Sequence, residues 1–295
     1  MMMLRTEGMQ GHKRREGKPG GFRLTCLVDN TAQLSSRLWA EHGLAFLIEA
    51  HGAKILFDTG QSGTVLAHNL AVLGEDLRDL SAIVLSHGHY DHTGGLAEAL
   101  SRAEGVEVVA HPDVFRERFS RRDEGLKSIG LPFARREIEA RARLRLERGP
   151  VEVAPGVMTT GQIPRGLGLE ARESRHVVRE GERLVPDPFH DDQALVLRTG
   201  RGLVVVLGCC HAGLVNTLEH VRNAFGGRVR AILGGTHLAR ADDASLARAI
   251  AAVRDEYDVE ELYLGHCTGA RGFIAFAQAL GERVKPCPAG LRIEF

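Results

Sequence analysis

The sequence predicts a single α/β domain, and two features of its pattern carry that prediction. Short runs of aliphatic and β-branched residues, such as residues 203–207, alternate with helical segments along most of the 295-residue chain. In the last third, three such strands each lead into a loop of glycine and histidine and then into a helix. Because α/β proteins tend to place their chemistry at the carboxyl ends of strands, we expect these histidines to be functional.

The expected elements follow one another without a clear linker. Strands are expected at residues 22–28, 44–50, 53–57, 83–85, 106–110, 151–157, 193–198, 203–207, 229–233 and 261–264. Helices are expected at residues 63–73, 96–101, 214–225 and 273–280, and around an apolar face that includes Leu246, Ile250 and Val253. We therefore predict one domain over residues 22–295, preceded by a basic, glycine-rich tail at residues 1–21 that should be disordered.

Two segments invite a functional interpretation. Residues 113–148 are rich in arginine, and residues 135–148 look helical, so this segment is either a solvated pair of surface helices or a cap that offers arginines to an anionic substrate. The connection between the strands at 151–157 and 193–198 is long for a compact domain, and long ordered loops are often functional.

Composition narrows the functional classes. Lysine plus arginine equals aspartate plus glutamate, 38 each, so nothing points to a nucleic acid or an acidic membrane as partner. No apolar run approaches the roughly 18 residues of a membrane span, and the basic start is not followed by the apolar stretch of a secretory signal. Five cysteines argue against a disulfide framework. We expect a cytoplasmic protein with a small-molecule substrate, either monomeric or a homo-oligomer.

The strongest chemical signal is a cluster of four residues directly after the strand at 83–85: His87, His89, Asp91 and His92. On a looping backbone, His87 and His89 can face one point, while Asp91 and His92 face a second point a few ångströms away. Imidazole nitrogen and carboxylate oxygen are ligands that suit zinc, iron or manganese. The cluster therefore predicts a metal site with one or two divalent ions.

The loop at residues 86–95, SHGHYDHTGG, resembles the signature loop of the metallo-β-lactamase superfamily, and residues 56–60, LFDTG, resemble its strand that ends in an aspartate. This resemblance covers about residues 22–295 and implies an αββα sandwich. A narrower set of motifs is similar to the dihydropterin-methyl ribofuranosylaminobenzene phosphate synthase group of methanopterin biosynthesis. These motifs are DNT at 29–31, EHGL at 41–44, GCCH at 208–211, GGTHL at 234–238 and HCTG at 266–269.

The resemblance implies further site residues, and it also shows a departure. His266 stands where the superfamily places its final metal histidine, but the position of the usual bridging aspartate falls in GCCH, which holds none. We expect His211 to bind metal there, with Cys209 as the weaker candidate. The usual middle histidine, near residues 161–163, is also missing, so the number of metal ions stays open.

Second roles are expected for three residues. His237 is a candidate catalytic acid–base, with metal ligation and support of a ligand as alternatives, and Asp91 is a candidate catalytic residue as well as a ligand. Asp58 should orient a ligand histidine through its ring N–H rather than bind metal. Histidines 42, 51, 68, 111, 176, 190 and 220 are interpreted as structural.

Three functions fit these residues. The first is a metallohydrolase that uses zinc, or iron, manganese or magnesium, to activate water against a small, anionic phosphate or ester. The second is a synthase-like transferase whose metal activates a pterin diphosphate. The third is a non-catalytic metal-binding protein, which the full set of histidines argues against. The same ligands serve the first two reactions, so the ligands alone do not separate them.

Overall fold

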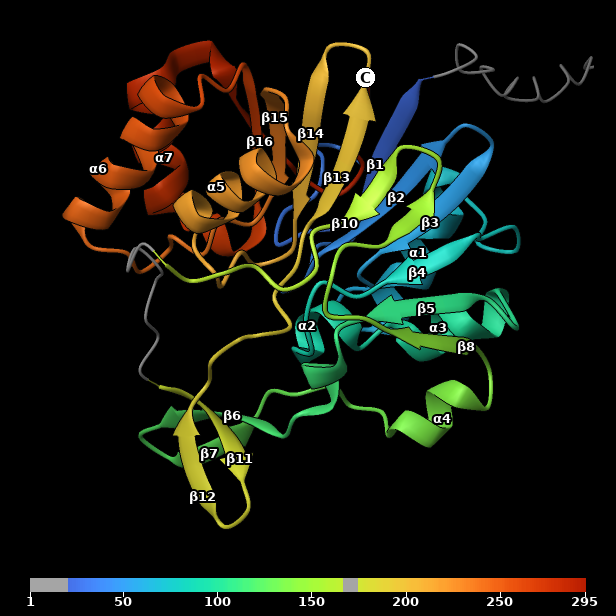
Figure 1. Cartoon of the computed structure of the whole chain (residues 1–295). Coiled ribbons are helices and arrows are strands. Elements are labelled where there is room, and N and C mark those ends of the chain that lie inside the picture. Colours follow the sequence, from blue (N-terminus) through green and yellow to red (C-terminus); the bar gives the residue numbers. More distant parts are fainter. Residues whose placement is uncertain (1–20, 167–174) are drawn as a thin grey trace, which may run out of the picture.

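The computed structural model describes residues 21–166 and 175–295, and it arranges them as two face-to-face sheets covered by helices on both outer sides (Figure 1). The tail predicted at residues 1–21 lies, except for Gly21, outside the described residues. The αββα sandwich that the sequence resemblance implied is confirmed.

The first sheet is mixed, with antiparallel pairing at one side and parallel pairing at the other. Its strands, in spatial order, are β18 (Arg292–Glu294), β1 (Phe22–Val28), β2 (Ala45–Ala50), β3 (Ala53–Phe57), β4 (Ala82–Val84), β5 (Glu107–Ala110) and β8 (Arg143–Leu146). Its outer helices are α1 (Gly63–Leu73), α2 (Tyr90–Thr93), α3 (Leu96–Arg102) and α4 (Arg135–Glu139).

The second sheet is also mixed, with antiparallel pairing at one side and parallel pairing at the other. Its strands, in spatial order, are β17 (Val284–Pro286), β16 (Glu261–Leu264), β15 (Val229–Gly234), β14 (Gly202–Leu207), β13 (Leu195–Thr199), β10 (Val157–Thr159) and β9 (Glu152–Ala154). The outer helices are α5 (Leu214–Phe225), α6 (Asp243–Ala251) and α7 (Gly269–Leu280). Strands β14 to β17 run parallel, so their carboxyl ends share one edge.

Burial on both faces explains why the central strands read as continuous apolar runs. In β14, Val204 and Val206 pack between the two sheets, whereas Leu203, Val205 and Leu207 pack beneath helices α5 to α7. A third cluster fills the space between the first sheet and helices α1 and α3. Three apolar layers therefore hold the four structural layers together.

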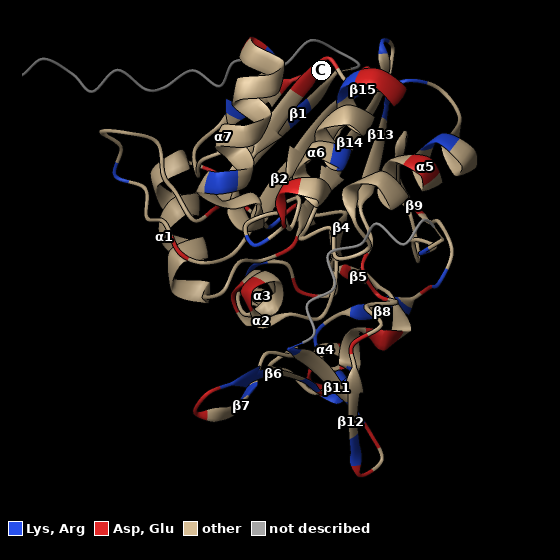
Figure 2. Cartoon of the chain, turned by 90° about the vertical axis from the view of Figure 1, so that its left-hand side faces the viewer, with Lys and Arg blue, Asp and Glu red and all other residues tan. Residues whose placement is uncertain are grey.

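A small four-stranded sheet projects below the sandwich (Figure 2). It consists of two hairpins, β6 (Arg118–Arg122) with β7 (Gly125–Ser128), and β11 (His176–Glu180) with β12 (Arg183–Pro186). The hairpins pair through β6 and β11. The long connection between residues 157 and 193 thus supplies half of this sheet.

The arginine-rich segment corrects the sequence prediction. Residues 135–148 do not form one helix: helix α4 ends at Glu139, and β8 then pairs in parallel with β5. Residues 113–148 are not a pair of surface helices either, because β6 and β7 occupy their first half. The predicted strand at 151–157 is also two strands, β9 and β10, which meet at a turn where Gly156 has φ +73°.

Within the described ranges, no helix is long and apolar enough to cross a membrane.

Candidate metal centre

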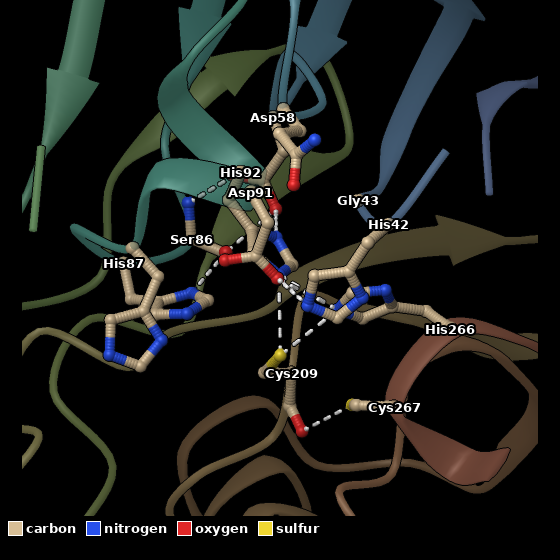
Figure 3. Close-up of polar contacts among 12 residues, drawn as sticks. His42, Gly43, Asp58, Ser86, His87, Asp91, His92, Cys209, His266 and Cys267 are labelled. Atoms are coloured by element: carbon tan, nitrogen blue, oxygen red, sulfur yellow. Dashed lines mark hydrogen bonds and ion pairs between the residues drawn. The ribbon is translucent and has the colours of Figure 1, made fainter. Parts of the chain in front are cut away.

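The predicted ligands come together where the parallel strands of both sheets end. His87, His89, Asp91 and His92 follow β4, while Cys209 and His211 follow β14. His237 follows β15, and His266 follows β16. Candidate ligands from both sheets therefore face each other across the sandwich, as Figure 3 shows for several of them.

The first group consists of His87, His89 and His211, whose candidate ligand atoms lie within 4.8 Å of one another. All three rings are buried. Nε2 of His87, Nε2 of His89 and both ring nitrogens of His211 have no hydrogen-bond partner among the described residues. Buried polar atoms are rarely left unsatisfied without a reason, so three converging imidazoles of this kind fit a bound cation.

The second group consists of Asp91, His92, Cys209 and His266, again with ligand atoms within 4.8 Å of one another. Nε2 of His92 lies 3.1 Å from Nε2 of His266, and Asp91 Oδ2 lies 3.5 Å from the same His266 atom. The structure thus separates the sequence motif into the two pairs expected from its spacing, His87 with His89 and Asp91 with His92. His211 falls in the first group and His266 in the second.

Residues behind the candidate ligands fix the orientation of the ligand rings, and we call these residues the outer partners. Asp58, which follows β3, accepts hydrogen bonds from His92 Nδ1, from the Ser86 hydroxyl and from the Ser86 backbone N–H, each at 2.7 Å. His266 is held in the same way, because its backbone N–H donates to Asp29 Oδ1 at 2.7 Å and its Nδ1 lies 2.9 Å from Asn30 Oδ1. Such partners set the tautomer of a ligand histidine and direct its other nitrogen toward the metal.

Electrostatics agree with metal binding. Burial lowers the pKa of His87, His89 and His211 well below the usual value, so these rings are neutral at pH 7 and present lone pairs, as ligation requires. Burial also opposes the charged form of His92, but the Asp58 and Asp91 carboxylates outweigh it and raise its pKa to about 9. The second group therefore attracts a positive charge.

Tight backbone geometry brings the two sheets' loops together. A Cβ atom at Gly208 would lie 2.2 Å from Ser86 Oγ, so only glycine lets the β14 loop approach the β4 loop. Four other residues of these loops, Asp58, Cys210, His237 and His266, have left-handed φ values between 48° and 60°. That conformation is costly for residues with a Cβ and is often found at functional sites.

His237 lies beside the first group, its ring centroid 4.3 Å from that of His211. With Cys209 and His211 it forms a third set of atoms that could hold a metal. Its backbone N–H donates to Cys267 Sγ at 3.2 Å. The three roles predicted for His237, acid–base, metal ligand and support of a ligand, all keep a geometric basis.

Sequence reasoning missed two histidines that it interpreted as structural. His42 Nε2 lies 3.2 Å from Asp91 Oδ2, and His176, on β11, has its ring centroid 5.4 Å from that of His89. For His42 a signal existed, since it belongs to the EHGL motif. For His176 none did, because only the pairing of β11 with β6 carries it over the site.

The first and second groups of candidate ligands both border one cavity of about 820 Å³. Its lining includes His89, Asp91, His211 and His266. It also includes four arginines: 121, 122 and 175 on or beside the projecting sheet, and 240 on the loop between β15 and α6. Asp123 and Glu124 also line it. The cavity is large enough for a small molecule and carries several cations in its wall.

Comparison with known proteins agrees with this geometry. Residues 38–266 match the family model of the metallo-beta-lactamase superfamily. The 7,8-dihydropterin-6-methyl-4-(beta-D-ribofuranosyl)-aminobenzene-5'-phosphate synthase of Methanocaldococcus jannaschii is 31% identical over 290 residues, 95% of this chain and 98% of that protein.

Solved structures show the same fold. Tm1679, described as a metal-dependent hydrolase of the beta-lactamase superfamily, matches with a TM-score of 0.80 and 30% identity, covering 93% of this chain and 99% of the other. Zn(2+)-bound PqqB from Methylobacterium extorquens matches with a TM-score of 0.54 and 13% identity, over 92% of this chain and 99% of the other, which shows the fold alone. The chain therefore belongs to the metallo-β-lactamase superfamily and is an enzyme of that fold.

Proposed function

We propose that this chain is a metal-dependent hydrolase of a small, anionic phosphate or ester substrate. The observation that carries the proposal is the cavity of about 820 Å³, which is lined both by candidate metal ligands and by four arginines. Arginine is the side chain best suited to planar, bidentate binding of phosphate and carboxylate groups. Arg121 and Arg122 belong to β6, so the projecting sheet takes the part of a cap offering arginines to an anion.

The proposed ligands are His87, His89 and His211 for one ion, and Asp91, His92 and His266 for the other. Zinc suits the imidazole-rich set best, with iron, manganese or magnesium as alternatives. When bound, a divalent ion supplies two effects: it polarises a phosphoryl or carbonyl oxygen, and it lowers the pKa of water from 15.7 toward about 7.

The remaining chemistry falls to protein side chains. Asp91 Oδ2 lies 3.2 Å from Nε2 of the half-exposed His42, which can donate a hydrogen bond that holds this carboxylate in position. His237 borders the cavity and can give a proton to the leaving group. The arginines hold the anionic end of the substrate, which orients the scissile bond toward the ligand cluster.

A second candidate is a transferase that displaces diphosphate from a pterin. It is favoured by the relative named as a synthase, whose 31% identity extends over 95% of this chain. The arginine-lined cavity would bind a diphosphate by the same contacts as a phosphate ester. The two candidates differ in the acceptor, which is water in one and a second organic substrate in the other.

The experiment uses the full chain loaded with zinc. Metal content is measured in the wild type, His87→Ala and His211→Ala, with His68→Ala as a matched control because His68 stacks on Trp39 away from both groups. The proposal expects about two ions in the wild type and the control and fewer in the other two variants. A panel of phosphodiesters, thioesters and pterin diphosphates then separates the candidates, since only the transferase needs an added acceptor. Full metal content in His87→Ala would refute the proposal.

We also place this activity in the cytoplasm, with no nucleic acid or membrane as partner. All five cysteines are free, as a reducing compartment favours. The equal numbers of basic and acidic residues are consistent with a small-molecule substrate.

A further inference from the structure

The thiol of Cys209 lies at the centre of the second ligand group. Its Sγ is 3.2 Å from Nε2 of His92 and 3.2 Å from Nε2 of His266, and these two nitrogens are 3.1 Å apart (Figure 3). Asp91 Oδ2 lies 3.7 Å from the first nitrogen and 3.5 Å from the second. Four candidate ligand atoms thus enclose one point.

The outer partners decide which protons are available at that point. Metal ligation requires the neutral imidazole, and because the Asp58 carboxylate can only accept, the neutral His92 ring carries its proton on Nδ1. Asn30 Oδ1 accepts from the Gly43 N–H at 3.2 Å, which identifies it as the oxygen and makes His266 Nδ1 the donor to it. The Nε2 atoms of His92 and His266 then each carry a lone pair, and these lone pairs are directed at each other and at Cys209.

With both rings neutral, the single thiol proton of Cys209 cannot satisfy both imidazole lone pairs. A cation satisfies both of them together. We propose that Cys209 is a thiolate ligand of the second metal ion, so that this position is bound by Asp91, His92, His266 and a sulfur that stands in for the missing aspartate. The inference rests on the metal centre of the proposed function and specifies its chemistry.

The neighbouring cysteines have other contacts. The Cys210 thiol packs in the apolar cluster under α5, with Sγ 3.4 Å from Thr217 Oγ1. Cys267 Sγ accepts from the His237 N–H at 3.2 Å and donates to the Cys209 carbonyl at 3.3 Å. Neither belongs to a ligand group among the described residues, so Cys209 alone is placed to bind.

A sulfur ligand has a consequence for metal choice. Thiolates favour zinc and other borderline or soft ions, whereas carboxylates suit magnesium and manganese. The second position should therefore select zinc or cobalt more strongly than a site with a bridging aspartate does.

The test is cobalt substitution of the full chain, read by absorption spectroscopy. Thiolate bound to Co²⁺ gives a charge-transfer band in the near ultraviolet, and imidazole and carboxylate ligands do not. The inference expects this band in the wild type, in Cys210→Ser and in Cys267→Ser, and its loss in Cys209→Ser. Zinc affinity at the second position should fall in Cys209→Ser by more than the roughly 10–100-fold that loss of an outer partner causes.

Cys209→Asp keeps the test decisive if the serine variant folds poorly. This variant should hold two ions without the charge-transfer band, and its preference should move from zinc toward manganese. A band that survives in Cys209→Ser, or that disappears only in Cys267→Ser, overturns the inference while the metal centre stands. Absence of any bound cobalt in the wild type would instead refute the proposed function itself.

Discussion

Replacement of Arg118 by methionine tests what holds the loop at residues 86–92, which carries four of the candidate ligands. Arg118 is fully buried on β6 and meets two buried carboxylates: its Nε donates to Asp187 Oδ2 at 2.8 Å, and its Nη2 donates to Asp191 Oδ1. The other oxygen of Asp191 accepts the Gly88 N–H at 2.8 Å, between His87 and His89. A guanidinium in the projecting sheet therefore helps to hold the loop that carries the candidate ligands.

The expected loss of folding stability is large because the substitution leaves two buried carboxylates without their positive partner. Breaking a buried ion pair by removing one partner costs about 3–5 kcal/mol, since the remaining charge is left without compensation. Burial already raises the pKa of Asp191 to about 6 against the opposing charge of Arg118. A domain's stability is typically only about 5–15 kcal/mol, so Arg118→Met should remove a substantial part of it.

Urea unfolding of the metal-free chain measures this loss directly. Arg135→Met is the matched control, because Arg135 pairs with Glu139 at 2.7 Å on exposed α4, where such a pair contributes about 0.3–0.5 kcal/mol. Zinc affinity of Arg118→Met should fall about 10-fold or more as Gly88 loses its anchor. A loss of stability below about 1 kcal/mol, similar to the control, would show that the two carboxylates do not depend on Arg118.

Three further outcomes are expected. Removal of metal by a chelator should lower the melting temperature. Zinc restored at 100 times its Kd should return about 2.7 kcal/mol of stability for each ion bound, measured by calorimetry, and an unchanged melting temperature would contradict a metal centre that joins both sheets. Asp58→Asn should reduce zinc affinity about 10–100-fold with the ligands intact, because His92 loses the carboxylate that orients it. Equilibrium dialysis measures this affinity, and an unchanged value would refute the orienting role of Asp58. Gly208→Ala should destabilise the fold by about 1–3 kcal/mol, because its Cβ would overlap the Ser86 hydroxyl, and denaturant midpoints equal to wild type would exclude that close approach.

Local patterns in the sequence were sufficient for much of this site. His87, His89, Asp91 and His92 lie within six residues after one strand, so a single loop conformation determines their grouping. The strands that precede the site are buried on both faces and therefore read as continuous apolar runs.

What the sequence could not provide depended on tertiary structure. Residues 143–146 read as part of an arginine-rich helix, but their alternation of arginine and leucine places Leu144 and Leu146 on the helix-covered face of an edge strand. His176 joins the site only because two hairpins far apart in the sequence pair through β6 and β11, with His176 opposite Ser120. Cys209 and His211 stand on one short loop, and which candidate ligand group each of them joins depends on the left-handed turn at Cys210, φ 60°.

That left-handed backbone sets a limit on how this protein can be made more robust. Asp58, Cys210, His237 and His266 each hold a conformation that glycine adopts freely and that costs an L-residue roughly 1–2 kcal/mol. Screening for heat resistance would therefore favour glycine at these positions, three of which also carry side chains of the metal centre. Thermal tolerance and reactivity compete for the same few positions, so the more durable variants of this chain should include some of the least active.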